Sequence, residues 1–149
     1  MTIAEANRVT VRRYYEEILN QRNLALVEEL FASDFTSHLR SGESDLPTYV
    51  ASIKRSLLAF PDLHVTIGVQ VAEGEIVATR WSAQGTHEGV FGNVQPTGRV
   101  ITLEAMDFHR LSDGKIREHW QQMDLMGILQ QIGTLSQMSQ QASKRRSGA

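Results

Sequence analysis

The sequence predicts an α+β domain in which helices come first and an antiparallel sheet follows. Apolar residues recur at helical spacing between Ile3 and Phe60. From Leu63 onward the chain changes to segments of strand length that are rich in Val, Ile, Thr and aromatic residues. Glu73-Gly74 and Asp113-Gly114 separate these segments in the manner of hairpin turns. Helices followed by a run of hairpin-connected strands favour an α+β fold over a parallel βαβ sheet.

Three helices are expected before the sheet. The first covers Ile3 to Asn20, and the second follows Asn23, a suitable N-cap, through Leu24 to Asp34. The third begins near Asp45 or Pro47. It ends at Phe60-Pro61-Asp62, because the residue before a proline disfavours helical geometry.

Four strands and a short final helix complete the expected domain, which we place at residues 1–135. The polar tail 136–149 is expected to be disordered. The strands are expected at Leu63–Ala72, Glu75–Thr86, Arg99–Leu111 and Lys115–Asp124, and the helix at Leu125–Ile132 with Gly133 as its C-cap.

Composition narrows the classes of partner. The 149 residues are 41% hydrophobic and 21% charged, with a net charge of −2, so no global charge directs the chain to nucleic acid or to an anionic membrane. The absence of cysteine excludes disulfides, thiolate nucleophiles and cysteine-based metal sites. No signal peptide or membrane span is recognisable, and we therefore expect a cytoplasmic protein.

The hairpin at Asp113-Gly114 predicts which side chains share a face. A two-residue loop pairs Ser112 with Lys115, and without irregularities every second pair then points to the same side. A three-residue loop would instead turn His109 outward. The face marked as inward by Leu103, Leu111, Ile116 and Trp120 would also carry Asp107, His109, Glu118, Gln122 and Asp124. Carboxylates in an apolar cavity have raised pKa values, which suits acid–base catalysis near neutral pH.

Three strings resemble the SnoaL-like polyketide cyclases, a family with the NTF2-like fold, over about residues 5 to 133. They are Phe60-Pro61-Asp62-Leu63-His64-Val65, Gly85–Phe91 with Pro96–Arg99, and Asp113–Trp120 with Asp124 and Gly127–Gly133. The resemblance implies an NTF2-like cone, with three N-terminal helices packed on a strongly curved antiparallel sheet. It also implies ring closure of a polyketide-like, small apolar intermediate by aldol-type condensation, without metal or cofactor.

The resemblance assigns roles to single residues. Asp124 matches the family's general acid and base, and His109 and His38 match assisting histidines. Side chains expected to contact the substrate are Trp120, Gln122, Asp107, Glu118, His87 and Phe91. The resemblance also implies a homodimer through the outer face of the sheet, where Ile101, Met106 and Phe108 are expected to supply apolar area.

Each assignment has a structural alternative. Asp124 could cap the final helix, His109 could pair with Glu118, and His38 could be a surface residue. The same fold also carries isomerases, dehydratases, epoxide-opening enzymes and non-catalytic ligand-binding domains. The expected register puts His109 and His119 on opposite faces, and we therefore predict no metal site. No phosphate-binding or nucleic-acid-binding motif is recognisable.

Overall fold

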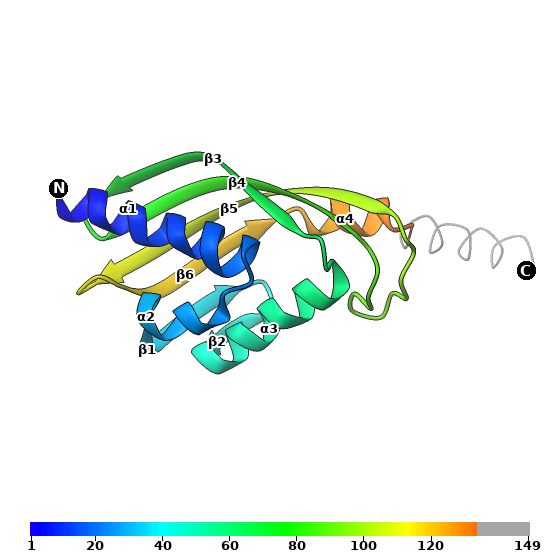
Figure 1. Cartoon of the computed structure of the whole chain (residues 1–149), viewed down its shortest axis with the longest axis horizontal. Coiled ribbons are helices and arrows are strands. Elements are labelled where there is room, and N and C mark those ends of the chain that lie inside the picture. Colours follow the sequence, from blue (N-terminus) through cyan, green and yellow to red (C-terminus); the bar gives the residue numbers. More distant parts are fainter. Residues whose placement is uncertain (134–149) are drawn as a thin grey trace, which may run out of the picture.

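The computed structural model describes residues 1–133 as helices packed against one curved sheet (Figure 1). The predicted tail at 136–149 lies outside the described residues. The helical elements are α1 (Ile3–Arg13), η1 (Tyr14–Asn20), η2 (Leu24–Leu26), α2 (Val27–Leu30), α3 (Leu46–Ala59) and α4 (Leu125–Gln131). The strands are β1 (Phe31–Leu39), β2 (Gly42–Asp45), β3 (His64–Glu73), β4 (Ile76–Thr86), β5 (Val100–Ser112) and β6 (Lys115–Met123).

The sheet has six strands in the order β2-β1-β6-β5-β4-β3. The four strands expected from the sequence are present as antiparallel neighbours β3 to β6. Strand β1 pairs in parallel with β6, so the sheet is mixed rather than wholly antiparallel. Helices α1 and α3 cover one side of it (Figure 1). The predicted α+β fold is confirmed, with two additional strands.

The first helix has the expected extent but changes geometry at Tyr14. Thr2 and Glu5 form a reciprocal capping box at its start. The last turns, η1, are π-helical, a rare form that occurs mainly as short segments and often at functional sites. The neighbouring side chains Tyr14 and Tyr15 are both buried there. This segment therefore sends two consecutive tyrosines into the interior.

The expected second helix is much shorter than predicted. It consists of η2 and α2, and the chain turns into strand β1 at Phe31. The prediction of a helix to Asp34 was wrong because β1 gains hydrogen bonds along the edge of β6, a long-range interaction that local propensity does not report. Phe35 and Ser37 alternate inward on this strand.

A β-bulge in β6 changes the predicted register of the last hairpin. The turn is the expected one: Ser112 faces Lys115, and both Asp113 and Gly114 have positive φ, as a type I′ turn requires. Beyond the pair Leu111–Ile116, however, Arg110 faces Glu118, so Arg117 is an extra residue. The rest of β6 is shifted by one position, which exchanges its two faces.

Helix α3 follows the prediction closely. Asp45 accepts a hydrogen bond from the Thr48 N–H at 2.9 Å, Pro47 lies in the first turn, and the helix ends at Ala59 before Phe60-Pro61.

The positive φ of Gly133 after α4 fits a helix C-terminus. Within residues 1–133, no helix combines the length and apolar character needed to cross a membrane.

Asn20 fastens η1 to strand β3, and we predict that it stabilises the fold. Its side chain accepts from the Val65 N–H at 2.7 Å and donates to the Val65 carbonyl at 2.9 Å. Asn20→Ala should lower the free energy of unfolding by about 1–3 kcal/mol, measured by urea denaturation. Asn20→Asp keeps the acceptor oxygen and should lose less of the free energy of unfolding. Equal stability of Asn20→Ala and wild type would contradict this role.

Candidate active site

An apolar cavity of about 210 Å³ lies between the helices and the concave face of the sheet. Its polar lining groups include Tyr14, Tyr49 and Gln121, together with two serines of α3. Its apolar wall includes Leu19, Ile53, Phe60, Trp81, Phe91, Leu103 and Ile128. A mainly apolar pocket with a few convergent polar groups is the usual form of a site for a small molecule.

Two tyrosine hydroxyls meet in the wall of this cavity. The Tyr14 and Tyr49 oxygens are 2.5 Å apart, and the side chains are 3% and 4% exposed. Burial is the main cause that raises the pKa of both phenols, so both are neutral at physiological pH. A neutral pair contains two protons, and only one can lie between the two oxygens. Among residues 1–133 neither hydroxyl has another partner, which leaves one proton to donate.

A buried carboxylate, Asp107, lies close to the cavity wall. Its Oδ2 accepts hydrogen bonds from the Tyr15 hydroxyl at 2.5 Å and from the indole N–H of Trp81 at 2.8 Å. Its Oδ1 has no partner among the described residues. Trp81 is at once a donor to Asp107 and part of the cavity wall, so the carboxylate lies just behind that wall.

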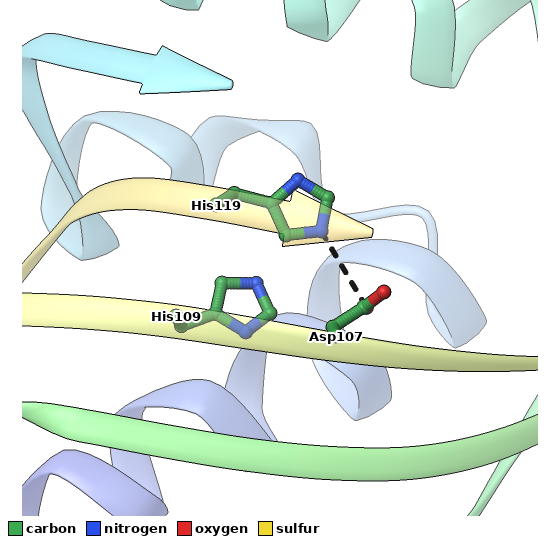
Figure 2. Close-up of side chains that lie close together, drawn as sticks. All are labelled: Asp107, His109 and His119. Carbon is green, nitrogen blue, oxygen red and sulfur yellow. Dashed lines mark ion pairs between the residues drawn. The ribbon is translucent and has the colours of Figure 1, made fainter. Parts of the chain in front are cut away.

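Two buried imidazoles accompany this carboxylate, as Figure 2 shows. His119 Nε2 is 3.5 Å from Asp107 Oδ2, and its Nδ1 is 3.2 Å from the Ser37 hydroxyl oxygen. The rings of His109 and His119 are stacked, with centroids 4.7 Å apart and planes at 21°. His109 packs edge-to-face with Tyr14 and Tyr15, but neither of its ring nitrogens has a hydrogen-bond partner in the described part of the chain.

The electrostatics fix the charge of the cluster. Burial opposes ionisation of Asp107, but the contacts with His119 and the Tyr15 hydroxyl outweigh it and hold its pKa below the usual value. Burial, and then the neighbouring His119, lower the pKa of His109 to about 3. At neutral pH the cluster therefore contains an aspartate anion beside a neutral His109. The raised carboxylate pKa that the sequence predicted is not found at Asp107, because its hydrogen-bonding and charged neighbours outweigh its burial.

The three residues also form a candidate metal cluster. This corrects the expectation that His109 and His119 lie on opposite faces of the sheet. His109 and His119 share the concave face rather than lying on opposite faces, and ligand atoms of these two and Asp107 lie within 4.8 Å of one another. An imidazole binds a metal in its ring plane, through a nitrogen lone pair. Two nearly parallel planes with centroids 4.7 Å apart do not direct their lone pairs to one point. The rings would have to reorient before both could bind one cation.

Two of the predicted site residues on β5 face inward as expected. Asp107 and His109 are 2% and 0% exposed on the concave side. The observed two-residue loop removes the alternative in which His109 points outward. Phe91 also lines the cavity.

The predicted position of Asp124 in the cavity was wrong. Leu103 does not pair with it, because the bulge shifts β6 and the strand ends at Met123. The exposed Asp124 side chain accepts from the Gly127 N–H at 2.9 Å and caps α4. The structural alternative for this residue is therefore the correct one.

The bulge also moves three expected substrate contacts to the outer face of the sheet. Glu118, Trp120 and Gln122 face away from the cavity. His38 was placed wrongly too: it stacks on Trp120 with centroids 5.0 Å apart and its Nε2 is 3.1 Å from Glu118. Ile101, expected on the outer face, is buried inside.

His87 is buried but does not line the cavity. Its Nδ1 is 3.0 Å from the Thr97 hydroxyl, and its ring packs on Phe60. Its backbone exchanges hydrogen bonds with Gly98 and Arg99. His87 therefore holds the loop between β4 and β5 in place, and the expected substrate contact of its side chain is absent.

Several residues of the site were not recognised in the sequence. The helical periodicity places Tyr14, Tyr15 and Tyr49 at apolar positions and says nothing about their hydroxyl groups. A wholly buried tyrosine needs a partner for its hydroxyl, and that requirement was the available signal. His119 and Gln121 were missed because nothing in the sequence marks the bulge.

Comparison with known proteins identifies the family of this chain. A family model described as SnoaL-like polyketide cyclase matches residues 9–132. The chain belongs to this family. Among proteins of curated function, none matches this SnoaL-like protein.

Solved structures share its fold. Wild-type IdmH of Streptomyces antibioticus, a proposed polyketide cyclase, is 31% identical, with 85% of this chain and 98% of that chain covered and a TM-score of 0.76. AclR of Streptomyces galilaeus, a proposed hydroxylase, is 26% identical, with 88% and 87% covered and a TM-score of 0.81. A proposed SnoaL-like polyketide cyclase of a Jannaschia species, 23% identical over 89% and 94% of the two chains, has the same fold with a TM-score of 0.82.

The buried His109 ring predicts a pH dependence of stability. Below pH 6.5 the unfolded chain binds a proton that the folded ring does not bind until about pH 3. The free energy of unfolding should therefore fall as the pH drops through this window, by up to about 1.4 kcal/mol per pH unit. His109→Leu should flatten this slope in urea titrations between pH 6.5 and 4.5.

The matched control is His64→Leu, which alters an exposed histidine on β3. It should retain the wild-type slope, because the slope comes from the buried ring. An unchanged slope in His109→Leu would show that another group causes the pH dependence.

Proposed function

We propose that this SnoaL-like protein catalyses acid–base chemistry on a small apolar carbonyl compound, leading to ring closure of a polyketide-like intermediate. One observation carries the proposal: the cavity contains a tyrosine hydroxyl pair with a proton to donate, beside a buried aspartate anion. The family supports ring closure as the outcome.

The tyrosine pair would bind the substrate's carbonyl oxygen. Whichever of Tyr14 and Tyr49 accepts the hydrogen bond of the other retains its own O–H for the ligand. Removal of a proton beside the carbonyl places negative charge on this oxygen. Preformed donors in an apolar site stabilise such charge more strongly than water does, because they need no reorganisation.

Asp107 would take up the proton. Its Oδ1 is free, while Tyr15 and Trp81 fix Oδ2. In the proposed step the substrate's α-carbon loses a proton to Oδ1, directly or through one water, and the enolate forms. The enolate carbon then bonds to a second carbonyl carbon of the same molecule. The new alkoxide oxygen receives the proton that Asp107 had taken from the α-carbon. The residue ends the cycle ionised, as it began.

His109 and His119 would act behind Asp107 rather than on the substrate. None of the three side chains of this cluster lines the cavity, but Asp107 is the one that is hydrogen-bonded to a residue of its wall, Trp81. His109 is neutral and therefore does not give a proton to the carboxylate, which stays ionised. His119 contributes a polar contact to Oδ2 of Asp107. The same enolate chemistry would serve an isomerase or a dehydratase, and family membership favours ring closure over these alternatives.

The test uses proton exchange, because enolate formation is the first step whatever the natural substrate. Wild-type protein should accelerate exchange of deuterium from D₂O into the α-position of a small cyclic ketone, followed by NMR. Asp107→Asn should lower the rate at least about 100-fold, the scale of a lost general base. Tyr49→Phe should lower it by about 10-fold or more, because the remaining Tyr14 hydroxyl loses the hydrogen bond that orients and polarises it.

Two controls make this test decisive. Asp124→Asn keeps a capping side chain on α4 and should exchange at the wild-type rate. Tyr14→Phe should behave like Tyr49→Phe, because either hydroxyl completes the pair. If the ketone binds in the cavity and wild type exchanges no faster than buffer, or if Asp107→Asn matches wild type, a binding-only role is the better account.

We also propose that the protein is a homodimer formed through the outer face of the sheet. Four exposed apolar side chains lie around a hollow of about 390 Å³ there: Val69, Val71, Met106 and Phe108. A continuous apolar area of this kind is typical of a contact between subunits, and two copies can bury it symmetrically.

Phe108→Glu should convert the dimer to a monomer. A carboxylate in the centre of an apolar interface loses its hydration without gaining a partner. Sedimentation equilibrium measures the change. Val9→Glu, at an exposed position of α1, is the control and should remain dimeric. A wild-type monomer would contradict the proposal.

A further inference from the structure

A larger groove at the surface lies next to the cavity. The groove has a volume of about 530 Å³ and lies between α3 and the loop that joins β4 to β5. It shares Ser52, Ser56 and Phe91 with the inner cavity, so the two spaces adjoin. The other lining residues are Arg55, Leu58, Val90 and Gly92.

Apolar walls of the groove are exposed and held in place by the backbone. Leu58 is 72% exposed and Val90 52% exposed, on opposite sides of the groove. The N–H groups of Glu88 and Gly89 both donate to the Ala59 carbonyl, at 3.0 and 3.1 Å. A Cβ at Gly89 would lie 2.1 Å from the Leu58 carbonyl oxygen, so only glycine permits this contact. The groove is therefore formed before any ligand binds, and it adjoins the cavity.

Arg55 is the charged residue of this groove. Among residues 1–133 it forms no ion pair and no side-chain hydrogen bond. The two serine hydroxyls of the lining already donate within α3, Ser52 to the Tyr49 carbonyl and Ser56 to the Ser52 carbonyl. The guanidinium is thus the charged side-chain donor that remains for a ligand in the groove.

From these features we infer that the substrate is elongated and carries a carboxylate at one end, which Arg55 binds in the groove while the carbonyl group lies at the Tyr14–Tyr49 pair. A single guanidinium matches a single carboxylate in charge and in hydrogen-bonding geometry. A phosphate carries more negative charge than one guanidinium neutralises, and no second charged side chain lines the groove among the described residues. The apolar middle of the molecule would lie along Phe91 and Leu58. This inference rests on the proposed function and names its substrate class.

The experiment compares a medium-chain oxo-carboxylic acid with its methyl ester. Binding is followed by the fluorescence of Trp81, which lines the cavity, in protein with Trp120→Phe on the outer face. The acid should bind about two- to fivefold more tightly than the ester, the range of a solvent-exposed ion pair. Salt should reduce this preference, because it screens exposed charges.

Arg55→Gln should remove the preference for the acid and leave binding of the ester unchanged. Lys54→Gln removes the neighbouring positive charge and should retain the preference. Equal affinities of acid and ester, or a preference that survives Arg55→Gln, would overturn the carboxylate assignment and leave the proposed function intact. If neither compound reaches Trp81, the carboxylate assignment and the proposed cavity chemistry both fail.

Discussion

The extra residue at Arg117 in β6 controls which side chains reach the interior of this protein. Before the bulge Ile116 faces the core, and after it His119 and Gln121 do so, whereas an unbroken strand would direct Glu118 and Trp120 inward. Arg117 itself is anchored at the surface, 2.8 Å from Asp34 on β1. A one-residue change of register thus separates the buried polar cluster from a charged and aromatic outer face.

Stability and chemistry are joined at Asp107. A buried carboxylate is tolerated only with compensating donors, and these come from Tyr15 in η1 and Trp81 in β4, with His119 of β6 nearby. The first helix, the centre of the sheet and the last hairpin therefore meet at one anion. The π-helical turn contributes twice, because it directs Tyr15 to the carboxylate and Tyr14 to the cavity. An arrangement built this way is rigid before any ligand binds, as electrostatic stabilisation of an enolate requires.

Local signals account for the parts that the sequence predicted. The Asp45 cap, the Phe60-Pro61 stop and the Asp113-Gly114 turn depend on neighbouring residues, and each lies where expected. Asp107 and His109 face inward because β5 is regular. Strand β1 depends on pairing with the distant strand β6, so it left no local signal. The bulge lies within the last hairpin, but no residue type there marks it. The error at the bulge then placed Glu118, Trp120, Gln122 and Asp124 on the wrong side, although Asp124 fits its observed role as a helix cap. The expected position of His38 came from the family resemblance and was wrong independently of the bulge.

The central claim is that the tyrosine pair binds an oxygen on which negative charge develops. A crystal structure of the complex with an aromatic phenol, a mimic of the enolate, tests it directly. The account predicts the phenol oxygen within hydrogen-bonding distance of the Tyr14 or Tyr49 hydroxyl, with its ring among the apolar residues of the cavity. A phenol bound at the outer face or beside Asp124, with the tyrosine pair still closed on itself, would contradict the account.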